Sequence, residues 1–543
     1  MKRTSTLSIF SFFFFGSLVL FLGCKKHDLN KISDVKWDPN LAVPIGYGDF
    51  GAYDLLAAKD SNDLIIDQTT RAVSLEYKGQ IASISAQEVV DLNDHTETMN
   101  LAPSDLSLAA VGSFSGVQNS TNTSTIDFPM SNGIELHDLN FENGTMNLNV
   151  STTLMHDVAL VLTFQDLSLN GVVLTKTMNL NYTGSVPQTA SATINLANVL
   201  GDFTAGNSAI NRLRVTVAST ISGTNAPIAG NESFDVSMGL TGLEFKNITG
   251  YFGQQSLAAA SDSILLKIFN NAINGDFTFT NPSLKFVVEN SFGIPMSINF
   301  NSLQSINAST GQISPLTGFP NPLVVNKPSA FGQTATTSLT LDNTNTSNMA
   351  TIITPTPKYL KYGIDAVANP SGNIGPLNFI EKNSKFVLKA ELSLPMEGFA
   401  SNFSVSDTMP LGNLNLGSSG DMIDWAMMRF NIDNGFPVGF NAQVKFIDTN
   451  GVTLFNLFSS PQTIIGAASV DGTGKVNAPK NKITDAKIAQ ENLKLLKKAN
   501  RIIITGIAET TAPSNSQIVK FYDNYRLKLK LGMQVQLKSN IKI

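Results

Sequence analysis

Alternation of apolar and polar residues dominates this chain and predicts β-strands. The longest case covers residues 525–537, where every second position is apolar and Arg, Lys or Gln fills most of the positions between. Strict period two over this length is typical of a strand with one buried face and one wet face. Shorter segments with the same alternation are 146–150, 213–217, 234–240, 284–288 and 296–300. The pattern predicts a mainly β protein.

Turn and helix signals support this prediction. Four Asn-Gly dipeptides can adopt the positive φ angles of tight hairpin turns, and they are Asn143-Gly144, Asn170-Gly171, Asn274-Gly275 and Asn450-Gly451. Helical periodicity is confined to residues 256–271 and 489–499, and the second of these segments runs into a predicted strand at 502–504. We therefore expect only a few short helices.

A unit of strand, polar crossover and second strand occurs three times along the sequence. The first strands are Met146–Val150, Leu284–Val288 and Met428–Ile432, spaced about 140 residues apart. The crossovers Asn290–Pro295 and Asp433–Pro437 are the best local match. A repeat of related β domains explains this spacing, although any two alternating strands joined by a turn look alike. The predicted modules are an N-terminal β-rich module at 37–133 and β-sandwich domains at 134–274, 275–420 and 421–543.

The crossover sequence Asn-x-Phe-Gly-Ile-Pro at 290–295 resembles the crossover of late-embryogenesis-abundant group 2 domains. This resemblance implies β-sandwiches without catalytic residues, and so the predicted fold is a series of Ig-like or group-2-like sandwiches. Residues 35–44, followed by 53–56, look like the opening of a group of uncharacterised Gram-negative envelope lipoproteins. That likeness implies a location and no activity.

The first 24 residues predict a lipid anchor. Lys2 and Arg3 precede an apolar run from residue 7 to 22, and Gly23 precedes Cys24, the single cysteine of the chain. This layout is typical of a secretory signal peptide, and it resembles the leader of bacterial lipoproteins. The resemblance implies cleavage after residue 23, acylation of Cys24 and a tether at 24–36. The alternative is an uncleaved transmembrane anchor, but the run of about 16 residues is shorter than the roughly 20 that a spanning helix needs.

Composition narrows the classes of partner. The net charge is −5 and only 15% of the residues are charged, against roughly 25% in an average protein. This balance argues against nucleic acid as a partner, since binding it requires basic patches. With Cys24 acylated no disulfide can form, and stability must come from packing.

The sequence offers no convincing catalytic or metal site. Residues 46–51 match G-x-G-x-x-G but lack the βαβ context of a dinucleotide site, so they predict a glycine-rich turn. The acidic group Asp91, Asp94 and Glu97 predicts a solvated turn, with a calcium site as the alternative. Asp421 and Asp424, beside Trp425, are the nearest candidates for the carboxylate pair of a glycosidase. We expect no catalytic residue, no metal and no cofactor.

Two triplets resemble the Asp-Ser/Thr-apolar acceptor for O-glycosylation in some Gram-negative envelope proteins. They are Asp262-Ser263-Ile264 and Asp407-Thr408-Met409, with Ser263 and Thr408 as the modified residues. A pattern of three residues carries little information, and Asp262-Ser263 could equally begin the helix predicted at 256–271 as its N-cap.

These observations together predict a lipid-anchored protein of the outer membrane. The residues after Cys24, Lys25-Lys26-His27-Asp28, leave both the periplasmic face and the cell surface open. Its function is expected to be that of a non-catalytic binding or structural module that engages a glycan, a protein or a lipid. The alternatives are a glycoside hydrolase and a carrier that binds lipid in an apolar groove.

Overall fold

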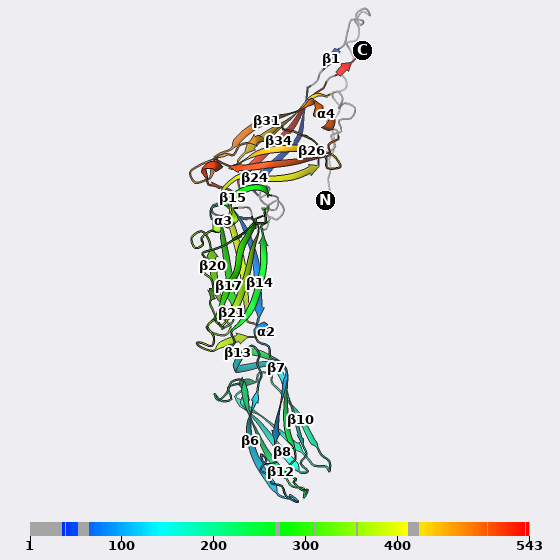
Figure 1. Cartoon of the computed structure of the whole chain (residues 1–543), viewed down its shortest axis with the longest axis vertical. Coiled ribbons are helices and arrows are strands. Elements are labelled where there is room, and N and C mark those ends of the chain that lie inside the picture. The colour runs from blue at the N-terminus through cyan, green and yellow to red at the C-terminus, as the bar shows by residue number, and fades with distance from the viewer. Residues whose placement is uncertain are drawn as a thin grey trace, which may run out of the picture.

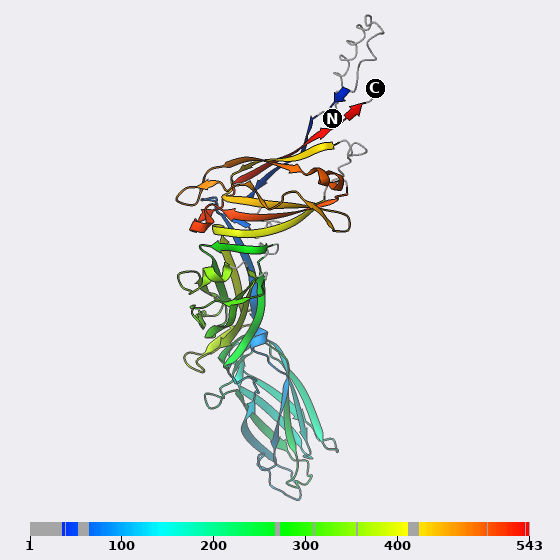
Figure 2. The same cartoon turned by 45° about the horizontal axis from the view of Figure 1, so that its top comes forward.

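The computed structural model describes residues 35–37, 40–52, 64–266, 272–307, 310–354, 357–410, 423–496, 498–537 and 539–541. Strands dominate it and three short α-helices interrupt them, so the predicted mainly β class is confirmed. Figures 1 and 2 show three β-rich bodies stacked in a row. We name them the proximal, middle and distal sandwiches, counting from the end at which the described chain begins and finishes.

The distal sandwich has two layers with strand orders β10-β7-β13-β5 and β9-β8-β12-β6, joined into one sheet by β11. Its strands are β5 (His95–Leu101), β6 (Val117–Asp127), β7 (Ile134–Thr152), β8 (Asp157–Leu169), β9 (Val172–Leu180), β10 (Gln188–Asn195), β11 (Leu200–Asp202), β12 (Arg212–Ser222) and β13 (Phe234–Phe252).

The middle sandwich pairs the sheet β20-β16-β23-β4-β3 with the sheet β14-β21-β17-β18, in which β19 also pairs with β17. Its elements are β3 (Leu64–Ile66), β4 (Val73–Ser85), β14 (Gln255–Leu265), β16 (Ser283–Asn290), β17 (Met296–Asn307), β18 (Ile313–Pro315), β19 (Leu323–Val325), β20 (Ala335–Leu341), α3 (Met349–Ile353), β21 (Pro357–Ala368) and β23 (Lys385–Pro395). Between it and the distal sandwich lie α2 (Ala86–Val89) and β22 (Asn378–Glu381), and β22 pairs with β13.

The proximal sandwich pairs the sheet β2-β34-β25-β31 with the sheet β15-β24-β32-β26-β27, to which β28 and β33 also belong. Its elements are β2 (Asn40–Gly51), β15 (Ala272–Phe279), β24 (Glu397–Pro410), β25 (Ile423–Asn434), β26 (Val438–Ile447), β27 (Thr453–Asn456), β28 (Gln462–Ile465), β29 (Ser469–Val470), β30 (Val476–Ala478), β31 (Lys480–Ile488), α4 (Gln490–Leu496), β32 (Arg501–Thr510), η5 (Pro513–Asn515), β33 (Val519–Lys520) and β34 (Arg526–Leu537). Beyond it, β1 (Val35–Trp37) pairs with β35 (Ser539–Ile541).

The three sandwiches share one plan and are nested within one another. In each sandwich, the first strand of a repeat pairs with a later strand of the same repeat, and that later strand also pairs with a strand from earlier in the chain. These triplets are β25-β34-β2, β16-β23-β4 and β7-β13-β5. The chain lays down β2, β4 and β5 in that order, completes the distal sandwich and returns to the middle one with β14. It then passes through the proximal sandwich as β15, completes the middle one from β16, and finally completes the proximal one from β24 onward. The distal sandwich is thus inserted in the middle one, and the middle one lies between strands of the proximal one, with proximal strand β15 interrupting it between β14 and β16.

This nesting relates to the predicted modules in a simple way. Each of the repeats at 134–274, 275–420 and 421–543 supplies the core of one sandwich, namely β7–β13, β16–β23 and β25–β34. The strands that precede each core come from earlier parts of the chain: β5 and β6 in the distal sandwich, β3, β4 and β14 in the middle one, and β2, β15 and β24 in the proximal one. The 37–133 range, in particular, contributes strands to all three bodies rather than forming a sheet of its own.

The repeat that the sequence predicts is visible in the crossovers. Asn290 Oδ1 accepts a hydrogen bond from the backbone N–H of Phe292 at 2.9 Å, and Asn434 Oδ1 accepts one from Phe436 at 2.9 Å. In the distal sandwich Thr152 takes this place, since its Oγ1 accepts from the backbone N–H of Leu154 at 3.1 Å. In each crossover the polar residue is fully buried and the second residue after it enters the core. Because a buried N–H without a partner is costly, this bond fixes where the apolar side chain points inward.

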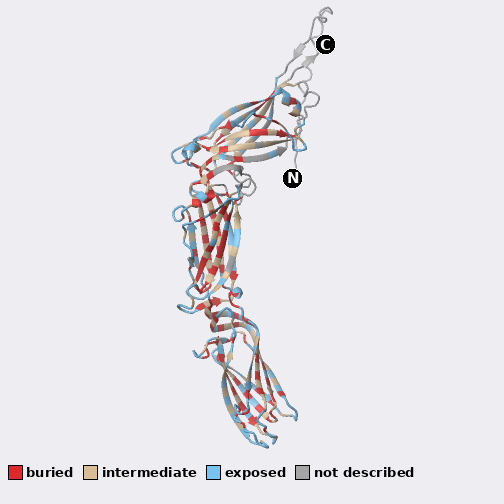
Figure 3. Cartoon of the chain, in the orientation of Figure 1, coloured by how far each residue is buried: buried red, intermediate tan, exposed pale blue. Residues whose placement is uncertain are grey.

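Burial follows the period-two pattern along the strands (Figure 3). In β34, Leu527 and Leu529 are half-buried whereas Arg526, Lys528 and Lys530 are exposed, as predicted for 525–537. The core of the distal and middle sandwiches is one continuous cluster, and it reaches Phe436 and Phe521 of the proximal one. A second cluster fills the remainder of the proximal sandwich.

Several local predictions need correction. Residues 256–265 form strand β14 instead of a helix, because pairing with β21 along its whole length outweighs the helix propensity of its alanines; residues 267–271 lie outside the described part. The G-x-G-x-x-G segment 46–51 belongs to strand β2 and not to a turn. A register shift against β34 between Pro44 and Gly46 accommodates the proline.

Two of the four Asn-Gly dipeptides also differ from the prediction. Asn170-Gly171 forms the β8–β9 turn, with φ angles of 52° and 79°, and Asn450-Gly451 lies in the β26–β27 turn. Asn143-Gly144 instead lies inside β7 at an irregular register with β13, and Asn274-Gly275 lies inside β15 at another. The helix predicted at 489–499 is confirmed as α4, whose Leu493 and Leu496 are buried.

Candidate functional site

The candidate modification residues lie in very different parts of the structure. Cys24 is outside the described residues, and no helix among those that are described is long and apolar enough to cross a membrane. Ser263 lies in β14 opposite Lys361 of β21, and Thr408 lies in β24 opposite Ile503 of β32. Because β14 and β24 are counterparts in their sandwiches, the two similar triplets stand on corresponding strands. Modification of Ser263 and Thr408 stays a prediction.

The acidic residues singled out in the sequence do not form a cluster in the structure. Asp94 Oδ1 accepts a hydrogen bond from the backbone N–H of Gly242 at 2.7 Å, and so it holds the start of β5 against β13. Glu97 lies in β5. Across the described ranges no group of His, Cys, Asp and Glu is arranged to hold a metal ion. Asp421 lies outside the described residues, and Asp424 and Trp425 lie in β25.

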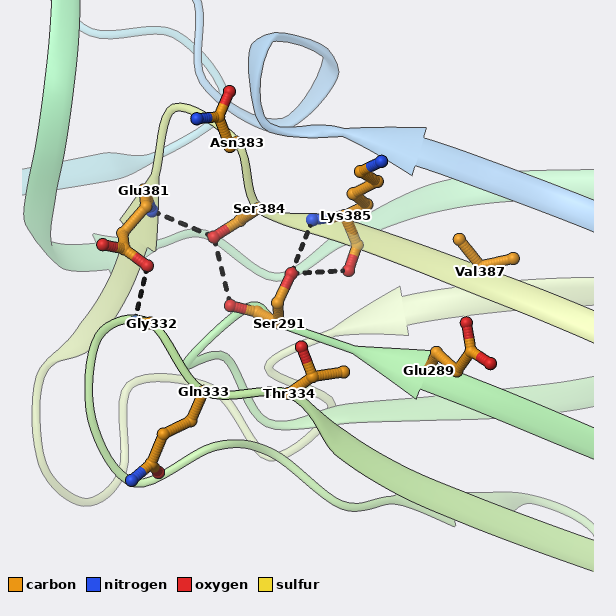
Figure 4. Close-up of a pocket in the computed structure, with 10 residues that line it drawn as sticks. All are labelled: Glu289, Ser291, Gly332, Gln333, Thr334, Glu381, Asn383, Ser384, Lys385 and Val387. Atoms are coloured by element: carbon orange, nitrogen blue, oxygen red, sulfur yellow. Dashed lines mark hydrogen bonds between the residues drawn. The ribbon is translucent and has the colours of Figure 1, made fainter.

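A pocket lies on the middle sandwich, at the end that faces the distal one. It has a volume of about 360 Å³ and is open to solvent. Figure 4 shows that its walls come from the crossover after β16, the loop before β20 and the turn between β22 and β23. The lining residues are Glu289, Ser291, Gly332, Gln333, Thr334, Glu381, Asn383, Ser384, Lys385 and Val387.

Two hydroxyl groups at the base of this pocket join the crossover to the β22–β23 turn. Ser384 Oγ donates to the carbonyl of Ser291 at 3.1 Å and accepts from the backbone N–H of Glu381 at 3.1 Å. Ser291 Oγ accepts from the backbone N–H of Lys385 at 2.7 Å and donates to its carbonyl at 3.0 Å. Both hydroxyls therefore serve as donor and acceptor inside the fold, and neither has a histidine partner that would make it a nucleophile.

The two carboxylates of the pocket are also engaged. Glu381 Oε2 accepts from the backbone N–H of Gly332 at 2.6 Å, which closes the loop before β20. Glu289 Oε1 accepts from Lys389 Nζ at 2.7 Å across the β16–β23 pair. A glycosidase needs one carboxyl group to donate a proton and a second to attack or activate water. Each carboxylate thus has one partner within the fold, and the pocket presents carboxylate, hydroxyl, amide and ammonium groups to a small polar molecule.

The free end of the distal sandwich repeats this use of acidic groups. Asp105 Oδ2 accepts from the backbone N–H of Ala102 at 2.8 Å, and Asp157 Oδ1 accepts from that of Tyr182 at 2.7 Å. Glu232 accepts from the backbone N–H groups of Ala229 and Gly230 at 2.6 and 2.8 Å. The loops 102–116, 153–156, 181–187 and 223–233 contain no Lys or Arg. This end therefore carries a few carboxylates and no cationic side chain in these loops, and the carboxylates hold the loops in shape.

One buried histidine at this end was not singled out by the sequence. His156 is fully buried in the β7–β8 crossover and lies edge-on to Phe114, with ring centroids 5.2 Å apart. Its Nδ1 lies 3.2 Å from the hydroxyl oxygen and 3.3 Å from the backbone nitrogen of Thr224, and its buried Nε2 has no hydrogen-bond partner among the described residues. Burial lowers the pKa of His156, and the nearby carboxylates of Glu232 and Asp157 oppose this only in part. The neutral ring is therefore the form that the fold accommodates.

We expect acid to weaken the distal sandwich through His156. Because the pKa is lower in the folded state than its ordinary value of about 6.5, the unfolded chain binds more protons at mildly acidic pH, and stability falls as the pH drops below about 6.5. The free energy of unfolding from urea titrations at pH 8 and pH 5.5 measures this loss. His156→Gln should reduce the difference between the two pH values, whereas His137→Gln should retain it. Equal pH dependence in all three proteins would contradict the assignment.

Comparisons with known proteins add little to this picture. No protein-family model matches the chain, and no curated protein matches it. Among solved structures, the chain is similar to a protein from Parabacteroides distasonis ATCC 8503 that is described as secreted, with 10% sequence identity and a TM-score of 0.33 over 92% of this chain and 99% of that one. A TM-score this low carries no argument about fold or function.

Proposed function

We propose that this chain is a lipid-anchored envelope protein that acts as a non-catalytic binding or structural module. In this role the proximal and middle sandwiches form a stiff spacer that holds the distal sandwich away from the membrane. The observation that carries the proposal is the position of the two ends of the described chain. Val35 pairs with Ile541 beyond the proximal sandwich, at the opposite end from the distal one (Figures 1 and 2). The described chain thus begins and ends at one extreme and has the free loops at the other.

Stiffness at the first junction follows from the nested path. Between the proximal and middle sandwiches, Val73 N–H donates to the carbonyl of Phe521 at 3.0 Å and Met396 N–H donates to that of Val73 at 2.9 Å. Phe521 N–H donates to the carbonyl of Met396 at 2.9 Å, which closes the set. Three chain segments therefore meet in backbone hydrogen bonds, where a serial arrangement would leave one linker. Phe521 and Met396 are also buried in the shared core.

The second junction is built in a similar way. Strand β22, which belongs to the middle part of the chain, pairs with β13 from Asn247 opposite Glu381 to Gly250 opposite Asn378. Asn369 Nδ2 donates to the carbonyl of Gly253 at 2.9 Å, and Lys382 Nζ donates to Glu244 at 2.9 Å. Backbone pairing and a buried amide are little affected by salt, unlike an exposed ion pair. This junction should keep its angle over a wide range of ionic strength.

The chemistry of the exposed sites favours binding over catalysis. The carboxylates of the pocket and of the free distal loops hold backbone N–H groups or an ammonium group, as described above. Active sites instead gather titratable groups with perturbed pKa values in a cleft. A surface rich in hydroxyl and amide groups with few charges suits a neutral partner such as a glycan or an uncharged protein surface.

Small-angle scattering of residues 25–543 tests the spacer. A compact globule of this length has a radius of gyration of roughly 24 Å, and we expect a value well above this, with the distance distribution of a rod. The profile should stay the same between 0.05 and 0.5 M salt. A radius near the compact value, or a profile that requires freely jointed bodies, would contradict the proposal.

A further inference from the structure

Strand β6 is an edge strand of the distal sandwich, and the loop after β5 contacts it through a hydrogen bond from Asn122 Nδ2 to the carbonyl of Asp105. It pairs with β12 from Val117 opposite Ser222 to Asp127 opposite Arg212 without a register shift, and within the described ranges it has no second partner strand. Natural proteins protect such edges with lysine, proline or bulges, because an open row of N–H and C=O groups invites pairing. None of these devices occurs in Val117–Asp127, whose alternate residues are exposed.

The same edge is covered in the proximal sandwich. Strand β24 is the counterpart of β6, since each pairs with the counterpart strands β32 and β12. On its other side β24 accepts β15 as an antiparallel strand, from Phe279 opposite Gly398 to Ala272 opposite Val405. This position of the fold therefore accepts an added antiparallel strand. In the distal sandwich the place that β15 fills is open.

The sequence of β6 indicates which strand would pair with this open edge. Residues 120–124 read Ser-Thr-Asn-Thr-Ser, which is the same in both directions. Antiparallel pairing of two copies about Asn122 would place Thr121 opposite Thr123 of the partner subunit, and hydroxyl pairs of this kind stabilise neighbouring strands. Asp127, the single charged residue of β6, would face the partner's Val117, so no like charges meet. Such self-complementarity is what a twofold interface requires.

We propose that two copies of this chain associate through antiparallel pairing of their β6 strands, with the twofold axis at Asn122. The two distal sandwiches then share a continuous sheet. The distal strands run roughly along the long axis of the molecule (Figure 1), and antiparallel pairing makes the two chains extend in opposite directions. If Cys24 is the anchor, as the proposed function holds, such a dimer joins two opposed surfaces; the pairing itself does not depend on the anchor.

Charge substitutions at the facing threonines test the register in sedimentation experiments. The chain from residue 25 onward should dimerise with rising concentration. Thr121→Lys with Thr123→Lys places lysine against lysine at both symmetric positions, and we expect the dissociation constant to rise on the order of tenfold. Thr121→Lys with Thr123→Glu places lysine against glutamate and should retain the dimer. Circular dichroism confirms that each variant folds. A wild-type monomer at all concentrations, or equal dissociation constants for the two variants, would overturn the proposal.

Cross-linking provides an independent test, because the chain from residue 25 onward contains no cysteine. At the twofold axis Asn122→Cys would face its own copy, at a Cα separation of about 4.5–5.5 Å that a disulfide can span. Mild oxidation should convert this variant to a covalent dimer. Gln118→Cys lies on the same face of β6 but would be opposite Ile126 of the partner subunit, and it should remain monomeric under reducing-agent-free electrophoresis. Cross-linking of both variants alike, or of neither, would contradict the proposed register.

Discussion

The Cys24→Ser protein should leave the membrane fraction. Serine lacks the thiol that is expected to carry the lipid. A single acyl chain gives only marginal membrane binding, and several chains give stable anchoring; removal of the acylated thiol therefore removes the whole anchor. The measurement is fractionation of cells that express the wild-type or variant chain, with detection in the membrane and soluble fractions.

The control for this experiment is Ser17→Ala, which changes the same leader and leaves the thiol in place. This variant should fractionate with the wild type. Mass spectrometry of the N-terminus adds a second readout, since the wild type should begin at an acylated Cys24. A Cys24→Ser protein that stays in the membrane with residues 1–23 intact would show that the leader is a transmembrane helix.

Strands were the most predictable part of the fold because their signal is local. The alternation at 525–537 needs only the side chains of one segment, and β34 follows it closely. The crossovers were predictable for a related reason. Phe292 and Phe436 lie in the two crossovers that match best in sequence, and both are buried. The asparagine two residues before each of them shows why the chain can turn there and still bury the ring.

Predictions were wrong where pairing with a distant strand outweighed the local sequence signal. The alanines at 258–260 favour a helix in isolation, yet β21, about a hundred residues later, pairs with them as a strand. Asn143-Gly144 has the composition of a turn, but it lies within the long pairing of β7 with β13, at a point where the register is irregular. In both cases the deciding contacts lie far away in the sequence, where no local window contains them.

The nested order of the sandwiches could not be read from the sequence for the same reason. Gln534 Nε2 donates to Asn40 Oδ1 at 2.8 Å across a separation of 494 residues. The residue pattern of neither segment indicates that it pairs with the other. The pocket was hidden as well. Ser291, Gly332 and Ser384 come from three loops, and each is an ordinary loop residue until the fold brings them together. His156 has no motif around it, and only its burial makes it notable.

The crossover bonds predict a large and position-specific loss of stability in the middle sandwich. Phe292 is fully buried, and its backbone N–H is held by Asn290, whose Nδ2 donates to the carbonyl of Asn326 at 3.0 Å. Phe292→Ala should lower the free energy of unfolding by about 3–5 kcal/mol through lost burial and the cavity left behind. Asn290→Ala should lower it by about 1–3 kcal/mol for each buried group left without a partner.

Phe292→Leu is the matched control, because Leu154 fills the corresponding position in the distal sandwich with the same backbone bond, donated to Thr152. A leucine therefore fits this crossover, and we expect its cost to be well below that of alanine. Urea unfolding followed by circular dichroism gives the three free energies, with Phe436→Ala and Phe436→Leu as the same comparison in the proximal sandwich. If leucine and alanine cost the same at both positions, the crossover residue is not a shared core anchor of the repeat. If leucine is tolerated at both positions, all three sandwiches begin their second sheet in the same way. In each, a buried polar side chain is followed two residues later by a buried apolar side chain.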